Sequence, residues 1–359
     1  MRPERIAVLG AGGFLGSHIA PALVAAGDTE IDAVDVQFDK LGPEHERIHR
    51  IRARIDEPAI IDEVVRRCDA VLSLTALCNP ALYNTKPLEV IDASYSDLVP
   101  LVKACAAHRK RLIHFSTCEV YGRTALDAAG RPMREMNEEE TGFFLGPLDR
   151  ERWTYACAKQ LLERVIWAYG RHQGLEFTVI RPFNVIGARM DFIPGVDGEG
   201  VPRVLASFIG ALLRGDELLL VDGGRPRRSF ISAEDFVGAI VAVLKRRDAC
   251  RGEVLNVGNP SNDISIRELA VALSRAFAAR LPGAAPARLR NVAAEEIYGP
   301  GYDDTAERIP DIAKARRLLD WEPRMSIAET IPPIVDDYLA RYGQPATPIR
   351  PAAGMQGGQ

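Results

Sequence analysis

Residues 6–16 read Ile6-Ala7-Val8-Leu9-Gly10-Ala11-Gly12-Gly13-Phe14-Leu15-Gly16, a short apolar run followed by a glycine-rich turn. Four apolar residues bounded by glycine are typical of a buried parallel strand. A helix is expected to follow, through about Ala26, and the glycines have the spacing G-x-x-G-x-x-G. Such glycines let the backbone turn tightly and approach a pyrophosphate, which then lies on the helix N-terminus. The pattern predicts a dinucleotide site with contacts from Gly10, Gly13, Phe14, Leu15 and Gly16.

A second strand is expected over Ile31 to Val36, and it carries Asp35 about twenty residues after the loop. A carboxylate at that place accepts hydrogen bonds from both ribose hydroxyls of NAD and repels a 2′-phosphate. A glycine-rich turn alone is weak evidence, because such turns occur in many folds. Here strand, loop, helix, strand and acid occur in order, so we favour NAD as the cofactor.

Strands and helices then alternate along the chain. Further strands are expected at 48–53, 70–74, 112–115 and 177–180, and helices at 58–67, 87–107 and 153–173. This alternation predicts an α/β fold of the Rossmann type, with a doubly wound parallel sheet. Ligands bind at the carboxyl ends of such strands. Cofactor contacts are therefore also expected from Leu74, Thr75, Ala76 and Pro182.

The pattern becomes irregular after the strand at 177–180, which predicts a second, smaller unit. We expect an NAD-binding domain over 1–183 with a returning segment at about 229–248. Residues 184–228 and 249–342 are expected to form a mixed α/β lobe over the carboxyl ends of the sheet. Residues 343–359 contain Pro, Gly and Gln with few large apolar groups, which predicts a disordered tail.

Composition excludes several classes of protein. The 45 basic and 49 acidic residues nearly balance and form no basic tract, so no nucleic-acid partner is expected. No apolar run approaches the roughly 18 residues of a membrane span, and no signal segment is recognised. The six cysteines are scattered, which indicates reduced thiols and a cytoplasmic location. The six histidines lack metal-ligand spacing, so no metal is expected.

Three polar residues suggest proton transfer. Thr117 follows the strand at 112–115, and Tyr155 and Lys159 are four residues apart on one helix face. Free tyrosine has a pKa of about 10 and is a poor base at neutral pH. A nearby ammonium and a positively charged nicotinamide favour its phenolate. Tyr155 would then take a proton from a sugar hydroxyl that Thr117 holds, while hydride passes to the cofactor.

This combination resembles the extended short-chain dehydrogenase/reductase superfamily over residues 4 to about 342. Within it, the chain looks like the UDP-glucuronate decarboxylase branch, and it is most similar to the UDP-apiose/UDP-xylose synthase family. The matching motifs are Ser116 to Gly122, Trp153 to Lys159, Met190 to Gly195, Gly200 to Ala206 and Gly301 to Asp304.

The resemblance implies an NAD-dependent reaction that oxidises UDP-glucuronate at C4. The resulting β-keto acid loses carbon dioxide. Reduction then gives UDP-xylose, whereas ring opening, contraction and reduction give UDP-apiose. The alternatives are a plain decarboxylase giving UDP-xylose or a UDP-4-keto-pentose, and a UDP-sugar epimerase or dehydratase. A catalytically silent NAD-binding regulator is a further alternative, but such proteins typically lack the Tyr or the Lys.

The same resemblance assigns roles to individual residues. Glu119 and Arg308 are implied as the decarboxylation pair, with an ordinary surface arginine as the alternative for Arg308. Cys78 and Cys118 separate the apiose synthases from the plain decarboxylases, because a thiol of pKa about 8.5 exchanges protons more readily than a hydroxyl. The alternative is that both thiols only pack, as expected for Cys157.

Substrate contacts are implied in the same way, and they are expected from Arg152, Asn184, Arg203, Val221, Arg228, Tyr302 and Arg308. The sequence departs from the family pattern at one place. Relatives often bind the adenine of the cofactor with an Asp-Ile pair after the third strand. This chain has Arg52-Ala53-Arg54-Ile55-Asp56 there, so Asp56 is only a candidate. The superfamily also implies a homodimer through the helices near 87–107 and 153–173.

Overall fold

The computed structural model describes residues 4–123, 125–127, 129–198, 200–282, 286–298, 303–305 and 307–343. Its centre is a seven-stranded sheet in the order β11-β6-β5-β4-β1-β2-β3, and all neighbouring strands are parallel. The strands are β1 (Glu4–Leu9), β2 (Thr29–Asp35), β3 (Ile48–Arg52), β4 (Ala70–Ser73), β5 (Arg111–Phe115), β6 (Phe177–Pro182) and β11 (Glu253–Val257). The chain starts in the middle, runs outward to β3, then returns to β4 and builds the other half. The predicted doubly wound sheet is confirmed.

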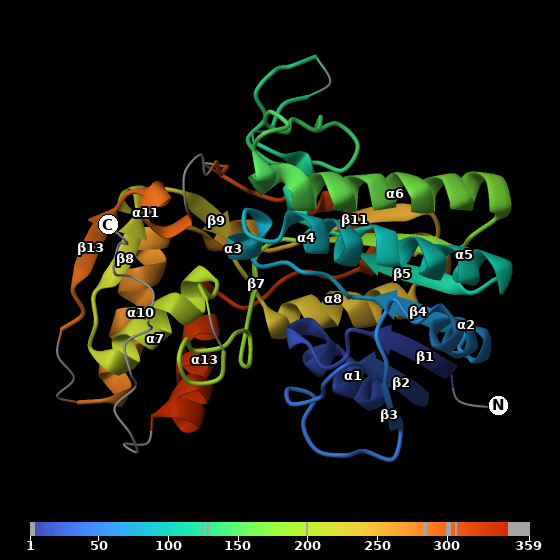
Figure 1. Ribbon diagram of the computed structural model, residues 1–359, viewed down its shortest axis with the longest axis horizontal. Helices are drawn as coiled ribbons and strands as arrows, with labels where there is room; N and C mark the ends of the chain where they lie inside the picture. The colour runs from blue at the N-terminus through green and yellow to red at the C-terminus, as the bar shows by residue number, and fades with distance from the viewer. Residues whose placement is uncertain are drawn as a thin grey trace.

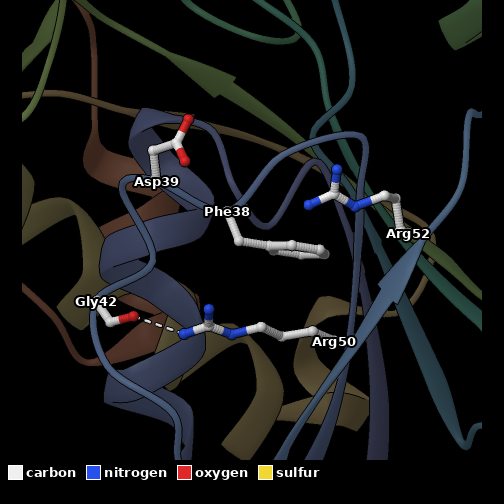
Figure 2. A pocket seen from close by; sticks show the side chains of 5 residues that line it. All are labelled: Phe38, Asp39, Gly42, Arg50 and Arg52. Atoms are coloured by element: carbon white, nitrogen blue, oxygen red, sulfur yellow. Dashed lines mark hydrogen bonds between the residues drawn. The ribbon is translucent and has the colours of Figure 1, made fainter.

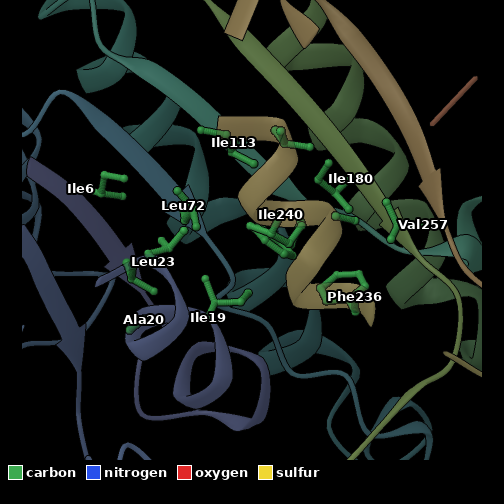
Figure 3. Close-up of a cluster of buried hydrophobic side chains, with 14 of the residues drawn as sticks. Ile6, Ile19, Ala20, Leu23, Leu72, Ile113, Ile180, Phe236, Ile240 and Val257 are labelled. Carbon is green, nitrogen blue, oxygen red and sulfur yellow. The ribbon is translucent and has the colours of Figure 1, made fainter. Parts of the chain in front are cut away.

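Helices cover both faces of this sheet (Figure 1). One face carries α1 (Phe14–Ala26), α8 (Ala233–Lys245) and α12 (Ala313–Leu319), and the other carries α2 (Pro58–Arg67), α5 (Val99–Ala107) and α6 (Thr154–Gln173). Figure 3 shows the core on the first face, where Ile19 of α1 and Ile240 of α8 meet Leu72 of β4. Burial on both faces explains why the strands are continuous apolar runs.

The long helix expected over 87–107 is divided in the structure. It consists of α4 (Pro87–Ser94), a single turn at Ser96–Leu98, and α5. The division falls at Tyr95, whose φ of −139° and ψ of −67° are not helical. Pro100 explains this, because its ring excludes a continuous helix through the preceding turn and it has no N–H to donate there.

The longer of the remaining elements form a smaller lobe, on the left of Figure 1. Its core packs three helices against a short parallel strand pair: α7 (Val204–Arg214), α10 (Ile266–Arg280), α13 (Ile327–Tyr342), β8 (Leu218–Val221) and β13 (Leu289–Val292). The shorter elements are α3 (Pro80–Tyr83), β7 (Val185–Ile186), β9 (Arg227–Ser229), β10 (Ile231–Ser232), α9 (Arg247–Cys250), β12 (Asp263–Ser265) and α11 (Ala294–Tyr298).

Two segments lie elsewhere than expected. Residues 249–342 were assigned to the lobe, but α12 packs on a face of the large sheet and β11 is an edge strand of it, beside β6. The side chains of β11 explain its position, because Leu255 and Val257 are fully buried in the core on the α1 side and Val254 packs into the core on the other side. The rest of the domain division stays a prediction.

Of the expected disordered tail, residues 344–359 lie outside the described residues. None of the helices in the described ranges is long and apolar enough to cross a membrane.

Candidate active site

The glycine-rich loop is held between three strands of the sheet. Gly10 has a φ of +88°, and a Cβ there would lie 3.2 Å from the backbone nitrogen of Thr75. A Cβ on Gly12 would lie 1.7 Å from the carbonyl oxygen of Gln37. The Gly12 N–H donates to Asp35 Oδ2 at 2.9 Å, which fixes the carboxylate beside the loop. The loop therefore needs glycine at both positions.

Gly16 and Gly13 differ in what surrounds them. A Cβ on Gly16 would lie 2.3 Å from the Gly10 carbonyl oxygen, so this glycine lets α1 pack on its own loop. A Cβ on Gly13 would meet only that carbonyl oxygen, at 3.4 Å. Gly13 precedes the first turn of α1, and no side chain caps this N-terminus. Its N–H groups are therefore free to bind an anion, and the loop fits the pyrophosphate of NAD.

The other expected cofactor contacts lie around this loop. Phe14 and Leu15 begin α1, and Pro182 ends β6. Leu74 follows β4 and donates its N–H to the Leu9 carbonyl at 3.0 Å, which places Thr75 and Ala76 at the carboxyl edge of the sheet. These positions agree with the way a dinucleotide lies across such an edge.

A pocket of about 490 Å³ opens where β2 and β3 end. Figure 2 shows the Phe38 ring between the side chains of Arg50 and Arg52, and Arg52 is the register partner of Asp35. The guanidinium of Arg50 lies 5.7 Å from the Phe38 ring centroid. Asp56, the candidate adenine contact, is exposed and pairs with Arg54 at 2.8 Å. Sequence reasoning did not identify this pocket.

Thr117, Tyr155 and Lys159 come together at the end of β5. Thr117 caps the short helical turn Cys118–Tyr121, and its hydroxyl accepts the Glu119 N–H at 3.2 Å. Both Tyr155 and Lys159 are buried on α6. Lys159 Nζ donates to the Phe115 carbonyl at 3.0 Å, which fixes α6 against the strand that precedes Thr117.

Burial sets the protonation of these two groups. Loss of solvent lowers the pKa of Lys159 to about 8. It also raises the pKa of Tyr155 well above its usual value, with a hydrogen bond to Thr117 acting in the opposite direction. Without a bound cation nearby, Tyr155 is therefore a phenol. A positive charge next to it would favour the phenolate, as expected for a base that works beside oxidised nicotinamide.

Two carboxylates and three arginines lie next to this group. Glu119 accepts from Arg152 Nη1 at 2.6 Å and from Arg308 Nη1 at 3.2 Å. Asp304 pairs with the same two arginines and with Arg228 at 2.6 Å. Arg308 is 4% exposed, so it is no ordinary surface arginine. Burial opposes charge on Glu119, but the two guanidiniums outweigh it and lower the pKa of its carboxyl group.

The two candidate thiols have different environments. Cys118 is buried, and loss of solvent raises its pKa, although the charge of Arg308 acts in the other direction. Cys78 is exposed in the loop after β4. The preceding residue, Leu77, packs against the cluster that contains Tyr155, so Cys78 lies near this group. Cys157 was expected to be a packing residue, but it is exposed.

Comparison with known proteins identifies the family. Residues 6–258 match the NAD dependent epimerase/dehydratase family, which is most of the chain. The chain belongs to this family. Membership in the NAD dependent epimerase/dehydratase family confirms the predicted fold and the NAD cofactor, and it identifies the protein as an enzyme.

Individual relatives are more specific. UDP-D-apiose/UDP-D-xylose synthase of Oryza sativa subsp. japonica is 42% identical, covering 92% of this chain and 87% of the relative. The synthase 1 of Arabidopsis thaliana is 41% identical, covering 91% and 89%. The crystal structure of the PbgP3 protein from Burkholderia pseudomallei is 31% identical with a TM-score of 0.83, covering 95% of this chain and 98% of that one. The predicted resemblance is confirmed.

A more distant structure shares the fold. It is a UDP-glucuronic acid 4-epimerase from Bacillus cereus in complex with UDP-glucuronic acid and NAD. It is 21% identical with a TM-score of 0.76, and the match covers 94% of this chain and all of that one.

The remaining residues that were expected to contact the substrate lie on different elements of this family member. Arg203 directly precedes α7, pairs with Asp191 at 3.1 Å and lies 5.9 Å from the Phe14 ring centroid, so it is near the cofactor loop. Asn184 donates its side-chain amide to the Ser229 carbonyl.

Val221 ends β8, paired with Val292. Tyr302 lies outside the described residues.

Sequence reasoning missed two residues near the site. One is Asp304, which appears in the sequence analysis only as the last residue of the motif Gly301 to Asp304. The other is Tyr83, which no sequence pattern singles out.

Proposed function

We propose that this enzyme converts UDP-glucuronate to UDP-apiose and UDP-xylose. The observation that carries the proposal is the buried ion pair of Glu119 and Arg308. Glu119 lies only two residues after Thr117 in the sequence. The site thus has a carboxylate-binding arginine beside groups suited to alcohol oxidation. The identity of 41–42% to named synthases over about nine-tenths of the chain supports the same substrate.

Oxidation begins at the C4 hydroxyl of the sugar. NAD supplies a hydride acceptor when bound and later returns the hydride. Tyr155 takes the hydroxyl proton while Thr117 holds the same oxygen, and the Lys159 ammonium favours the phenolate. Lys159 has a pKa of about 8, so it is mostly charged at neutral pH.

Decarboxylation follows from the new carbonyl. The bond between C5 and the carboxylate breaks, carbon dioxide leaves, and the electron pair becomes an enolate on the C4 oxygen. Tyr155, now protonated, and Thr117 stabilise that oxygen by hydrogen bonding. A proton added to C5 restores the ketone, and reduction at C4 gives UDP-xylose with no net redox change.

UDP-apiose formation requires further proton transfers, because the ring must open by retro-aldol cleavage and close again. We assign these steps to Cys78 and Cys118. Cys78 is exposed near the cluster that contains Tyr155, where it can exchange protons with a substrate. Arg228 and Arg203 are assigned to the diphosphate, because guanidiniums bind phosphate oxygens in bidentate geometry.

A plain UDP-glucuronate decarboxylase is the second candidate. It is favoured by the burial of Cys118, which raises the pKa of that thiol and opposes its use as a base. In that case the same oxidation and decarboxylation occur without ring contraction.

The proposal includes a homodimer formed through α4 and α6. Three large apolar side chains are exposed on these helices: Leu88 at 74%, Leu161 at 47% and Trp167 at 44%. Helices α4 and α6 pack together on the same face of the sheet (Figure 1). Burial of such groups against a second copy is favourable. A cytoplasmic location is proposed because all six cysteines are free.

The test is proton and carbon NMR of the purified enzyme with UDP-glucuronate and catalytic NAD. Signals of a branched five-membered sugar, or of the cyclic phosphate into which UDP-apiose decays, support the synthase. UDP-xylose or a UDP-4-keto-pentose alone supports the plain decarboxylase. Unchanged UDP-glucuronate contradicts both.

A further inference from the structure

Asp304 joins three arginine side chains that come from distant parts of the sequence. Its Oδ1 accepts from Arg308 Nη2 at 3.0 Å and from Arg152 Nη2 at 3.3 Å. Its Oδ2 accepts from Arg228 Nη2 at 2.6 Å. Burial raises the pKa of the carboxyl group, but the three guanidiniums outweigh burial and hold it well below its usual value. Asp304 is therefore charged at neutral pH.

Glu119 completes this arrangement from the opposite side. It accepts from Arg152 at 2.6 Å and from Arg308 at 3.2 Å, the two arginines that Asp304 also contacts. Glu119, Arg152, Asp304 and Arg308 therefore form a closed ring of alternating charge, which we call the charge ring. Its formal charges cancel, and Arg228 lies outside it.

The backbone holds Asp304 in place before any substrate arrives. The Thr305 N–H donates to Asp304 Oδ1 at 2.8 Å. The Thr305 hydroxyl donates to the Gly122 carbonyl at 2.8 Å, and Thr305 is 2% exposed. The segment is thus anchored to the loop that follows Glu119, so the charge ring is preorganised.

A neutral ring has a consequence for a carboxylate that must leave as carbon dioxide. A strong ion pair in the ground state is lost in the transition state, so it raises the barrier. A hydrogen bond from a ring without net charge orients the carboxylate of the substrate without attracting it strongly. The barrier to decarboxylation is therefore not raised by a lost ion pair. Arg308 has a donor for such a bond, because its Nε is buried without a hydrogen-bond partner among the described residues.

We propose that Asp304 is a positioning residue for decarboxylation, which neutralises Arg152 and Arg308 so that the substrate carboxylate is oriented but weakly held. We assign to Asp304 Oδ2, which accepts from Arg228, the role of holding that side chain toward the diphosphate of the substrate. This inference rests on the proposed function, because it takes UDP-glucuronate as the substrate.

The test compares two ligands that differ in the carboxylate. Dissociation constants for UDP-glucuronate and UDP-xylose are measured by calorimetry on NADH-loaded enzyme, which cannot oxidise C4. Replacing Asp304→Asn leaves the ring with a net positive charge. UDP-glucuronate should then bind about tenfold more tightly relative to UDP-xylose, since a charged hydrogen bond contributes that much. Any gain from a released Arg228 affects both ligands and cancels in the ratio.

The second measurement is carbon dioxide release in a single turnover with NAD-loaded enzyme. The Asp304→Asn variant should release it about tenfold more slowly despite tighter binding. A merely structural role would weaken both ligands and slow the reaction together. A binding ratio within twofold of the wild type, or an unchanged release rate, would overturn the proposal.

Three further variants control the experiment. Asp304→Glu keeps the charge and should keep the binding ratio within about twofold. If it shifts the ratio as far as Asp304→Asn does, the effect is steric and the proposal is wrong. Asp303→Asn removes the neighbouring carboxylate, which pairs with Arg123 instead, and should leave the ratio unchanged. Asp304→Ser replaces the Asn variant if that one fails to fold.

Failure of the proposed function can be distinguished from failure of the proposal for Asp304. If the wild-type enzyme releases no carbon dioxide from UDP-glucuronate, the proposed function is wrong. The binding ratio needs no turnover, so it tests Asp304 in either case.

Discussion

The ring of Tyr83 lies almost parallel to the ring of Tyr155, with centroids 5.0 Å apart and an angle of 14° between the planes. Tyr83 belongs to α3 in the loop region after β4, whereas Tyr155 belongs to α6. The contact therefore holds the phenol ring of the proposed base from an element other than its own helix.

This contact predicts an effect on the rate at Tyr83. An aromatic pair contributes about 0.5–1.5 kcal/mol beyond its burial. Tyr83→Leu should therefore lower kcat with UDP-glucuronate about two- to tenfold, through a less ordered Tyr155. Tyr83→Phe keeps the ring and serves as the control, with kcat within twofold of the wild type. Equal losses in the two variants would show that the hydroxyl of Tyr83 matters and not its stacking.

The buried Lys159 predicts a conflict between stability and activity. Its pKa is lowered from 10.5 to about 8 on folding, so the unfolded chain binds more protons between these values and stability rises with pH there. Below pH 8 the folded protein retains the full penalty of a buried charge. Lys159→Met removes it, and Tm at pH 7 should rise by about 2–4 °C. Turnover should fall at least a hundredfold.

The pH dependence of that gain checks its cause. Thermal unfolding of the wild type and Lys159→Met from pH 7 to 9.5 should show the difference in Tm shrinking above pH 8. Lys103 is exposed on α5, and Lys103→Met should show no such trend. A Tm difference that is constant with pH would mean that the buried charge is not its source.

Two adjacent glycines should separate cofactor binding from folding. A Cβ at Gly13 meets almost nothing within the protein, whereas a Cβ at Gly12 collides with the Gln37 carbonyl. Gly13→Ala should keep the Tm of the cofactor-free enzyme within about 2 °C but weaken NAD binding at least tenfold, because the methyl group occupies the place of the pyrophosphate. Gly12→Ala should lower that Tm clearly. Unchanged NAD affinity in Gly13→Ala would contradict the assignment of this loop.

The two thiols should control which pentose is formed. Cys78→Ala and Cys118→Ser should each reduce the UDP-apiose share of the products at least fivefold, because ring contraction needs additional proton transfers. UDP-xylose formation should continue. NMR of the product mixture measures the ratio, and Cys157→Ala, on the exposed side of α6, is the matched control. An unchanged ratio in both variants would leave the thiols as packing groups.

The sequence predicts the sheet well because its signals are local. Strand and helix positions such as β1, α1 and α2 follow from apolar runs, glycine spacing and Pro58, all within a few residues of one another. The division at Tyr95 was missed, since Pro100 acts on the turn before it.

The candidate site was predicted only in part, because its partners are distant in sequence. Thr117, Tyr155 and Lys159 form a recognisable pattern. The contact of Arg152 with Asp304 joins residues 152 positions apart, and no spacing rule identifies it. Likewise, Tyr83 has no sequence signal, since its role depends on where α3 packs against α6.

The position of β11 also determines when this protein can finish folding. The strand is the last of the seven to be synthesised, yet it pairs with β6 and buries Leu255 and Val257. Until residue 257 has left the ribosome, a nascent chain presents the unpaired edge of β6 to its surroundings. Exposed edges of this kind pair with other chains, so the interval between synthesis of β6 and β11 is the period of greatest aggregation risk. A fragment cut before β11 would retain that edge permanently.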